Sequence, residues 1–563
     1  MKFNDMPYSR PDEKVALAAL RAEVEKINKA NSAEEQLSAL KSFEEISKEF
    51  FTMETISYIR NTINTKDEFY DEERKFFDSV GPLFSEVYVD MNKSLLNSKF
   101  RKGLEEELGT LIFVNAELEN KGFSPEIIPL MQEENTLCSE YQKLYASAKV
   151  DFDGKSLTLP ELSAYKSKAD RATRKAAFEA EGKFFDDNQE KFDEIYDKLV
   201  KNRTEQARKL GFENYVELGY IRRGRNCYDV NGVANFRKQV LNDLVPVVKK
   251  LKEEQKKRIG IEDFKFYDDT FAFLDGNPTP KGTPDELLAA AKKMYTEMND
   301  ITKGFIEFLY DNELFDVLTR EGKAPGGYCA YIDKYKSPFI FASFNGTQHD
   351  VEVLTHEAGH AFADYISSKE IKWSMLRCPS YEGAETHSMS MEFLTSPWHN
   401  LFFKEDTAKY KLAHAEDALI FIPYGTMVDY FQQLVYEKPE MTPQERNQTW
   451  ADLEKQFRPY LDFDNLPFYG RGAGWQRQTH IYGSPFYYID YCMAQITALQ
   501  VWSEFLKDKN VAWEKYYNFV KLGGTKTFID LVLNAGLKSP LEDGTIKSIT
   551  DEVSVWLEKN KNI

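Results

Sequence analysis

The 563-residue sequence is poor in cysteine and lacks a long apolar run. Its five cysteines lie far apart and form no C-x-x-C pair, which argues against a disulfide framework and favours a reduced, cytoplasmic setting. The most apolar stretches, such as residues 418–428, fall short of the roughly 18 residues that a membrane-spanning helix requires. The N-terminal segment carries an acid at Asp5 and no apolar run, so a secretory signal is not expected.

Positive charge is also scarce relative to negative charge. The chain carries 73 lysines and arginines against 92 aspartates and glutamates, for a formal net charge of −19. Such a surface repels nucleic acid and anionic lipid, so neither is an expected partner. The 42% apolar and 14% aromatic content is typical of an ordinary folded protein. The sequence leaves a monomer and a small homo-oligomer equally open.

The N-terminal third is predicted to be helical. Apolar residues recur three and four positions apart in the segments 18–30, 34–50 and 100–118. A β-hairpin is expected at residues 150–162, where Asp-Gly supplies the turn. We place a soft boundary near residue 200, which separates an N-terminal helical lobe (residues 1–200) from a second domain (residues 201–563).

The pattern changes after residue 318. Paired glycines and a run of β-branched and aromatic residues from Pro338 to Phe344 predict a small sheet, and a helix is expected from Asp350 to Ser367. A second helix is predicted from about Gly383 to Thr395, and a third starts near Pro485. The glycine-rich segment 466–484 between them is expected to form a mobile loop.

A metal-binding pattern lies on the first of these helices. Histidine is scarce, with seven in the whole chain, yet His356 and His360 stand four residues apart in His-Glu-Ala-Gly-His. Residues i and i+4 project from one face of a helix, so both imidazoles can hold one metal ion. Glu357 beside them is placed to take a proton from an attacking water. The pattern predicts metal-assisted hydrolysis.

Catalytic zinc needs a third protein ligand and an open position. The class that takes a third histidine from H-E-x-x-H-x-x-G-x-x-H is excluded, because Ala363 and Ile366 occupy the glycine and histidine positions. A glutamate from a following helix is the alternative, and the candidates are Glu382, Glu385 and Glu392. A structural site with four protein ligands also stays open, with His387 as a possible fourth.

These motifs together resemble the thimet oligopeptidase and oligoendopeptidase F group of zinc metallopeptidases. In that family the third ligand follows the second histidine by 25 residues, which implies Glu385 as the third ligand of one zinc ion per chain. A second family glutamate follows seven residues later and matches Glu392, which would orient a ligating histidine from outside the coordination shell.

The resemblance extends to both sides of the motif. The family's strand before the zinc helix is expected to pair with the substrate backbone. The resemblance therefore implies substrate contacts at Gly326, Gly327, Phe341 and Ala342. Downstream, the family's histidine-tyrosine segment implies hydrogen-bond donors to the developing oxyanion. They are His480 and Tyr491, with Tyr488 next, and Tyr482 is a weaker candidate for a substrate contact.

The resemblance implies two helical lobes around a deep cleft, with a small β-sheet beside the zinc helix. It also implies an endopeptidase that cuts internal bonds of short oligopeptides. Two other functions stay open on the sequence alone. One is a zinc metallocarboxypeptidase of similar helical fold, and the other is a non-catalytic peptide-binding protein with structural zinc.

Overall fold

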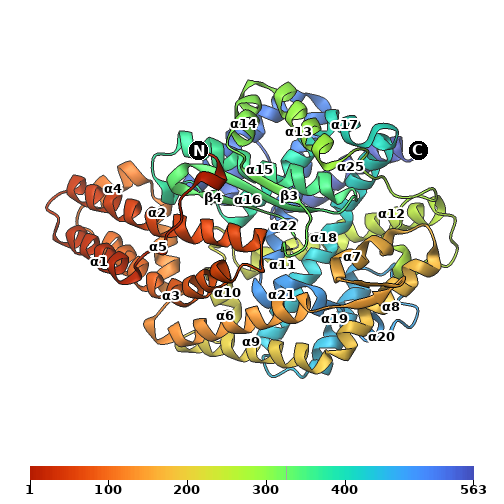
Figure 1. The fold of residues 1–563 in the computed structure, drawn as a ribbon, viewed down its shortest axis with the longest axis horizontal. Helices are drawn as coiled ribbons and strands as arrows, with labels where there is room; N and C mark the ends of the chain where they lie inside the picture. Colours follow the sequence, from red (N-terminus) through yellow and green to blue (C-terminus); the bar gives the residue numbers. More distant parts are fainter. Residues whose placement is uncertain (325, 563) are drawn as a thin grey trace.

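A computed structural model describes residues 1–324 and 326–562 as a mainly helical molecule (Figure 1). The strands in this part of the chain form two small sheets, one of two strands and one of three. The three-stranded sheet packs against the helix that carries His356. The mainly α fold class is therefore confirmed, as is the small sheet beside the predicted metal helix. No helix among the described residues is both long and apolar enough to cross a membrane.

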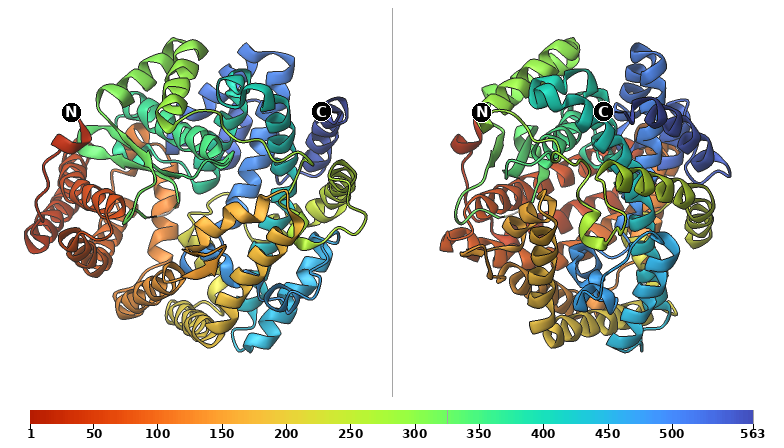
Figure 2. Two further views of the ribbon diagram at one scale, coloured as in Figure 1. Left: turned by 45° about the vertical axis from the view of Figure 1, so that its right-hand side comes forward. Right: turned by 90° about the vertical axis from the view of Figure 1, so that its right-hand side faces the viewer.

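The N-terminal helices form an arm on one side of the molecule (red in Figures 1 and 2). They are α1 (Glu13–Lys29), α2 (Ala33–Ile63), α3 (Glu68–Leu96), α4 (Arg101–Leu108) and α5 (Leu111–Lys121). Asp12, Ser32 and Asp67 cap the first three by accepting hydrogen bonds from first-turn amides. Where one helix was expected over residues 100–118, the structure has two, because Gly109 adopts a φ of +76° that ends α4.

The predicted hairpin is present. Strands β1 (Val150–Phe152) and β2 (Lys155–Leu157) pair in antiparallel register, with Phe152 opposite Lys155. Asp153 and Gly154 between them have φ of 51° and 69°. Two consecutive positive φ angles are the hairpin geometry that Asp-Gly favours, so local sequence accounts for this element.

The three-stranded sheet has the order β3-β5-β4, with β3 (Phe315–Leu318) parallel and β4 (Tyr328–Ile332) antiparallel to β5 (Ser337–Phe344). The expectation that β5 pairs with a substrate backbone is therefore wrong, because β5 has a protein strand on each side. β5 is buried along almost its whole length, as expected for a central strand. Among the described strands, the outer edges of the sheet belong to β3 and β4.

The predicted helix after the sheet is α15 (His349–Glu370), and it packs against β5 and α16 (Tyr381–Leu394). α16 in turn packs along α22 (Tyr488–Lys507). Gly359 allows the close approach of α15 and α16, since a Cβ there would lie 2.6 Å from Ser388 Cα and 2.8 Å from the His387 carbonyl oxygen. The glycine of His-Glu-Ala-Gly-His thus brings the histidine helix against the helix of Glu385.

The segment 466–484 was expected to be a mobile loop, and the structure corrects its conformation. It folds into α20 (Pro467–Gly470), a 3₁₀ turn at Gly474–Arg477 and α21 (Thr479–Gly483). Trp475 in the turn is fully buried, and its indole N–H donates to Asn447 Oδ1 at 2.8 Å. Large aromatic side chains packed into the core hold the segment despite its glycines.

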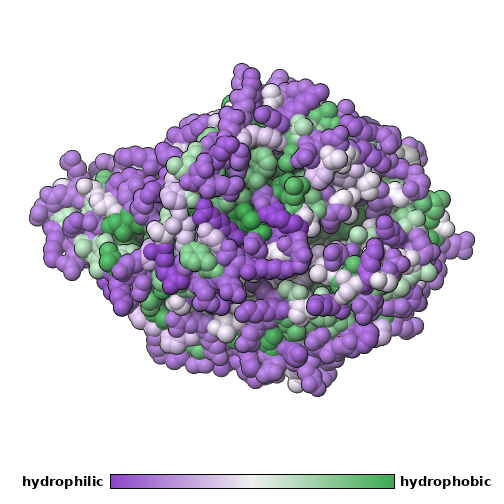
Figure 3. Space-filling view, viewed as in Figure 1, coloured by the Kyte–Doolittle hydropathy of each residue, from purple (hydrophilic) through white to green (hydrophobic). Residues whose placement is uncertain are grey.

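The expected boundary near residue 200 falls inside α9 (Gln189–Lys209), where Leu199 and Val200 are buried, and the division into two domains stays a prediction. The remaining helices are α6 (Ile128–Ala146), α7 (Leu159–Ser163), α8 (Arg171–Asp187), α9 (Gln189–Lys209), α10 (Tyr215–Arg222), α11 (Val230–Gln239), α12 (Val245–Arg258), α13 (Pro284–Met298), α14 (Asp300–Asp311), α17 (Asn400–Phe403), α18 (Thr407–Glu437), α19 (Pro443–Phe457), α23 (Lys509–Val520), α24 (Phe528–Asn534) and α25 (Thr545–Asn560). The face seen in Figure 3 is hollowed near its middle, in the region where Figure 1 shows the three-stranded sheet approaching α22 and α18.

Candidate metal centre

His356, His360 and Glu385 meet between α15 and α16. One potential ligand atom from each residue lies within 4.8 Å of the other two. Glu385 Oε2 is 3.2 Å from His356 Nε2 and 3.4 Å from His360 Nε2. Helix α15 places the two imidazoles one turn apart, and the close packing at Gly359 brings the carboxylate to them. Two imidazole nitrogens and one carboxylate oxygen form a donor set that suits zinc.

Glu392 links this cluster to a histidine that the sequence did not point to. Its Oε1 lies 2.8 Å from His356 Nδ1, and its Oε2 lies 2.8 Å from His414 Nε2 on α18. Burial would raise the pKa of Glu392, but hydrogen bonds to the two imidazoles lower it to about 2. The ionised carboxylate accepts from Nδ1 of His356, which leaves Nε2 free to face Glu385.

Glu357 lies beside the two histidines on the buried side of α15 and is 7% exposed. Burial raises the pKa of Glu357, and the neighbouring histidines oppose this rise. Gly327 leaves room next to this carboxylate, because a Cβ there would lie 2.7 Å from Val353 Cγ1 and 3.4 Å from Glu357 Oε1. Gly326 before it adopts a φ of +98° with open space around it. Of these two predicted substrate-contact residues, Gly327 therefore borders the candidate base.

The histidine-tyrosine segment lies on the other side of the cluster. The His480 ring centroid is 5.0 Å from that of Tyr488 and 6.0 Å from that of Tyr491. The residue that contacts the metal cluster directly is Tyr487, whose hydroxyl donates to Glu385 Oε1 at 2.5 Å. Tyr487 belongs to the aromatic block of this segment, but the sequence did not single it out. The available signal was its spacing of four residues from Tyr491, which places both tyrosines on one face at the start of the predicted helix.

His480 is held as a neutral imidazole with a defined donor. Gln478 Nε2 lies 2.8 Å from His480 Nδ1, and Gln478 Oε1 accepts from the Tyr424 hydroxyl at 2.9 Å. With the amide nitrogen donating to Nδ1, the ring carries its proton on Nε2. Burial lowers the pKa of His480 to about 4, so the ring is neutral at physiological pH. His480 can therefore donate one hydrogen bond from Nε2.

Three predicted substrate contacts do not reach the site through their side chains. The Tyr482 side chain is fully buried, its ring stacks on Tyr141 with centroids 3.8 Å apart, and its hydroxyl donates to the Phe192 carbonyl. Phe341 and Ala342 are fully buried in central strand β5. The expected contact of Tyr482 is wrong because core packing occupies its side chain. At Phe341 and Ala342 core packing excludes a side-chain contact with substrate.

His387 does not join the cluster either. It is 2% exposed, and its ring lies against Phe519 with centroids 5.5 Å apart. Burial lowers the pKa of His387 to about 3. Within residues 1–324 and 326–562, the candidate cluster comprises three residues, so the four-ligand structural site built with His387 finds no support in this geometry.

Comparison with known families covers most of the chain. Residues 3–123 match the peptidase M3 N-terminal domain, and residues 164–551 match peptidase family M3. The structure is similar to that of Pz peptidase A with an inhibitor, with a TM-score of 0.97 and 46% identity over 100% of both chains. It is also similar to the crystal structure of a proposed oligoendopeptidase F from Bacillus anthracis, with a TM-score of 0.92 and 44% identity over 99% of this chain and 98% of that one.

Two curated relatives are more distant. An oligoendopeptidase F homologue of Borreliella burgdorferi is 27% identical over 334 residues, which span 58% of this chain and 55% of the relative. The match thus covers little more than half of that relative's length. Oligopeptidase PepF of Bacillus subtilis is 21% identical over 540 residues, or 90% of this chain and 78% of the relative.

Proposed function

The chain belongs to peptidase family M3, and on that premise we propose that it is a zinc-dependent endopeptidase that hydrolyses internal bonds of short oligopeptides. The observation that carries the proposal is the convergence of His356, His360 and Glu385 with Glu357 beside them. The structural similarity to Pz peptidase A, whose sequence is 46% identical over the whole chain, supports this proposal.

The three clustered residues fit zinc. Catalytic zinc sites use three nitrogen or oxygen ligands from the protein, and Glu392 holds His356 from behind as expected for such a ligand. Tyr487 engages Oε1 of Glu385, which leaves Oε2 on the side of the two imidazoles. When bound, zinc supplies Lewis-acid polarisation of the scissile carbonyl and lowers the pKa of water.

Glu357 is the proposed general base. Its carboxylate makes no hydrogen bond with other described side chains or backbone groups, so it is free to accept a proton from the attacking water. Burial raises its pKa toward the range in which a carboxyl both accepts and releases protons. The same group can then pass the proton to the leaving amine. One residue thus serves both proton transfers.

His480 and Tyr491 are the proposed donors to the oxyanion, with Tyr488 as a further candidate. His480 presents Nε2–H because Gln478 occupies Nδ1. Negative charge develops on the carbonyl oxygen only as the water adds, so such donors stabilise the transition state more than the bound peptide. Tyr487 is assigned to holding Glu385, since its hydroxyl is already committed to that carboxylate.

The proposed substrates are short peptides, and the proposed setting is the cytoplasm. Strand β4 begins directly after Gly327, and no described strand pairs with its outer edge. A free strand edge suits backbone pairing with an extended peptide. The formal net charge of −19 disfavours nucleic acid and anionic membranes as partners.

A digest of defined peptides, followed by mass spectrometry, tests the function. We expect internal cuts that stop when a chelator removes the metal and resume when zinc is restored. Stepwise loss of C-terminal residues would instead support a metallocarboxypeptidase. Hydrolysis that persists in chelator would overturn the zinc-dependent mechanism.

A further inference from the structure

The side chain of Arg223 is unpaired in the part of the chain that the structure describes. This residue directly follows α10, and within residues 1–324 and 326–562 no hydrogen bond or ion pair involves its side chain; its Nε is buried without a partner. Buried guanidinium N–H groups are nearly always paired in folded proteins. Arg225 two residues on also has an unpartnered Nε and Nη1, but its Nη2 donates to Asp490 Oδ1 at 3.0 Å and to the Phe486 carbonyl.

Arg223 lies close to the candidate metal centre. Its Cζ is 5.5 Å from the ring centroid of Tyr487 and 5.2 Å from that of Tyr381. Tyr487 in turn donates to Glu385, so a single tyrosine side chain separates the guanidinium from a proposed zinc ligand. An extended peptide rises roughly 3.3 Å per residue and would cover this separation in about three residues. Tyr381 is 42% exposed, so a ligand can reach this surface.

Two acids lie near Arg223, and each has one carboxylate oxygen bound by another group while its second oxygen is buried without a hydrogen-bond partner. Asp490 pairs with Arg225, and Glu382 accepts a hydrogen bond from the Tyr228 hydroxyl. Tyr381 is the first residue of α16, so the positive end of that helix lies beside the guanidinium. No ion pair joins Arg223 to either acid among the described residues, so the guanidinium keeps its hydrogen-bond donors for a ligand.

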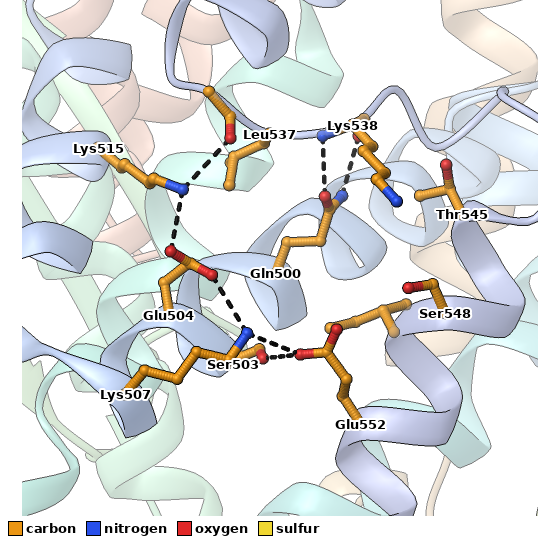
Figure 4. Close-up of a pocket in the computed structure, with 12 residues that line it drawn as sticks. Gln500, Ser503, Glu504, Lys507, Lys515, Leu537, Lys538, Thr545, Ser548 and Glu552 are labelled. Carbon is orange, nitrogen blue, oxygen red and sulfur yellow. Dashed lines mark hydrogen bonds and ion pairs between the residues drawn. The ribbon is translucent and has the colours of Figure 1, made fainter.

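A surface pocket elsewhere shows the opposite arrangement (Figure 4). It lies between α22 and α25 and shares no residue with the metal centre. There Lys507 pairs with Glu504 and Glu552, and Lys515 pairs with Glu504. These two lysines are neutralised within the pocket, whereas the third lysine that lines it, Lys538, is exposed to solvent. Arg223 differs in that it is unpaired beside the candidate metal centre.

We propose that Arg223 binds a carboxylate of the peptide substrate, within about three residues of the cleaved bond. The proposal rests on the peptidase function proposed above. The carboxylate is either the C-terminal group of a short peptide or the side chain of an aspartate or glutamate. A guanidinium recognises both sources in the same way, because its planar fork matches the two oxygens of a carboxylate.

Cleavage of matched peptides separates the two sources. One arm compares a peptide that ends in a free carboxylate with its C-terminal amide, and the other compares Asp with Asn at each position near the cut bond. In at least one of these two comparisons we expect the zinc-loaded enzyme to cleave the peptide with the carboxylate with a higher kcat/KM than its neutral counterpart, by about tenfold or more. Arg223→Gln should abolish this preference, mainly through KM, and Arg223→Lys should keep part of it. Arg208→Gln is the matched control, since Arg208 is exposed and unpaired among the described residues, and it should retain the full preference.

Binding keeps the test independent of turnover. The same peptide pairs are titrated calorimetrically into Glu357→Gln protein with and without Arg223→Gln. A carboxylate preference that vanishes with Arg223→Gln supports the site even if no cleavage is found, in which case only the peptidase function fails. An equal preference in both proteins, or none in either arm, would overturn the role of Arg223. A uniform loss of activity toward all peptides would also overturn it, because that is the signature of a purely structural residue.

Discussion

The hydroxyl of Tyr487 donates to Oε1 of Glu385 at 2.5 Å, while Oε2 of the same carboxylate faces the imidazoles of His356 and His360. The two oxygens of Glu385 are held by different residues. Oε1 accepts from Tyr487, whereas Oε2 accepts from Ser388 at 3.0 Å and is turned toward the proposed metal position. Tyr487 is therefore an orienting residue for the proposed zinc ligand.

Removing the hydroxyl should loosen that ligand. We expect Tyr487→Phe to weaken zinc binding or activity by about tenfold, at the lower end of the range for groups that hold a metal ligand. Competitive zinc titration and kcat/KM measure the two effects. Tyr165→Phe is a suitable control, since it removes only a hydrogen bond to Asp153 in the β1–β2 hairpin. Unchanged zinc affinity and unchanged kcat/KM would show that Tyr487 does not position Glu385.

Glu392 should matter through the two histidines that it bridges. Glu392→Gln replaces the ionised acceptor of His356 and His414 by a neutral amide. We expect zinc affinity to fall by about 10–100-fold, because the amide no longer holds His356 by a charged hydrogen bond. His414→Ala removes only the contact of Glu392 with His414, leaves its contact with His356, and should lower the zinc affinity less. A larger loss for His414→Ala than for Glu392→Gln would contradict this order.

Glu357 should be needed for turnover and dispensable for metal binding. Glu357→Gln keeps the shape of the side chain and removes its capacity to accept a proton. We expect kcat to fall by about 10²–10⁴-fold, the usual contribution of a general base. Elemental analysis should still find one zinc per chain. An active variant would exclude Glu357 as the base, and a zinc-free variant would assign it to metal binding.

Low pH should weaken the ion pairs of Glu181 with Lys166 and Arg477, which hold the segment that carries His480. Glu181 on α8 is buried and pairs with Lys166 at 2.5 Å and with Arg477 at 3.0 Å. Burial would raise its pKa, but the two cations hold the pKa at about 2, below the ordinary value of 4.5. Because the folded pKa is depressed, the stabilisation is complete above pH 4.5 and is lost as pH falls toward 2. Its size is on the order of 3 kcal/mol.

Urea unfolding at several pH values measures this loss. The free energy of unfolding of the wild type should fall more steeply between pH 5 and 3 than that of Glu181→Gln, which has no proton to gain at this position. The variant should already be less stable at pH 7, since it leaves Lys166 buried without its anion. Parallel pH profiles for the two proteins would show that Glu181 does not carry the acid sensitivity.

Local sequence was sufficient for the elements whose neighbours lie close along the chain. The four-residue spacing of His356 and His360 put both imidazoles on one face of α15, since helical geometry repeats every 3.6 residues. Asp153 and Gly154 fitted the hairpin turn for an equally local reason. Glu385 was reached by a different route, since only the family resemblance separated it from Glu382 and Glu392.

Tertiary structure decided the contacts between elements distant in sequence. The position of β5 in the middle of its sheet depends on β3 and β4, although the nearly continuous apolar run from Pro338 to Phe344 was a sign of a strand buried on both faces. Tyr487 reaches Glu385 while Tyr482 is packed in the core, and both were tyrosines of one aromatic segment.

The physical reason is that helical and strand periodicity fix which side chains share a face, whereas packing fixes what that face meets. His414 shows this most simply, because nothing within α18 indicates that Glu392 of α16 will lie 2.8 Å away. The sequence by itself therefore determined the histidine pair, the proposed base beside it and the helical class of the protein. The carboxylate bridge, the tyrosine on Glu385 and the unpaired Arg223 beside it came only from the way the helices pack.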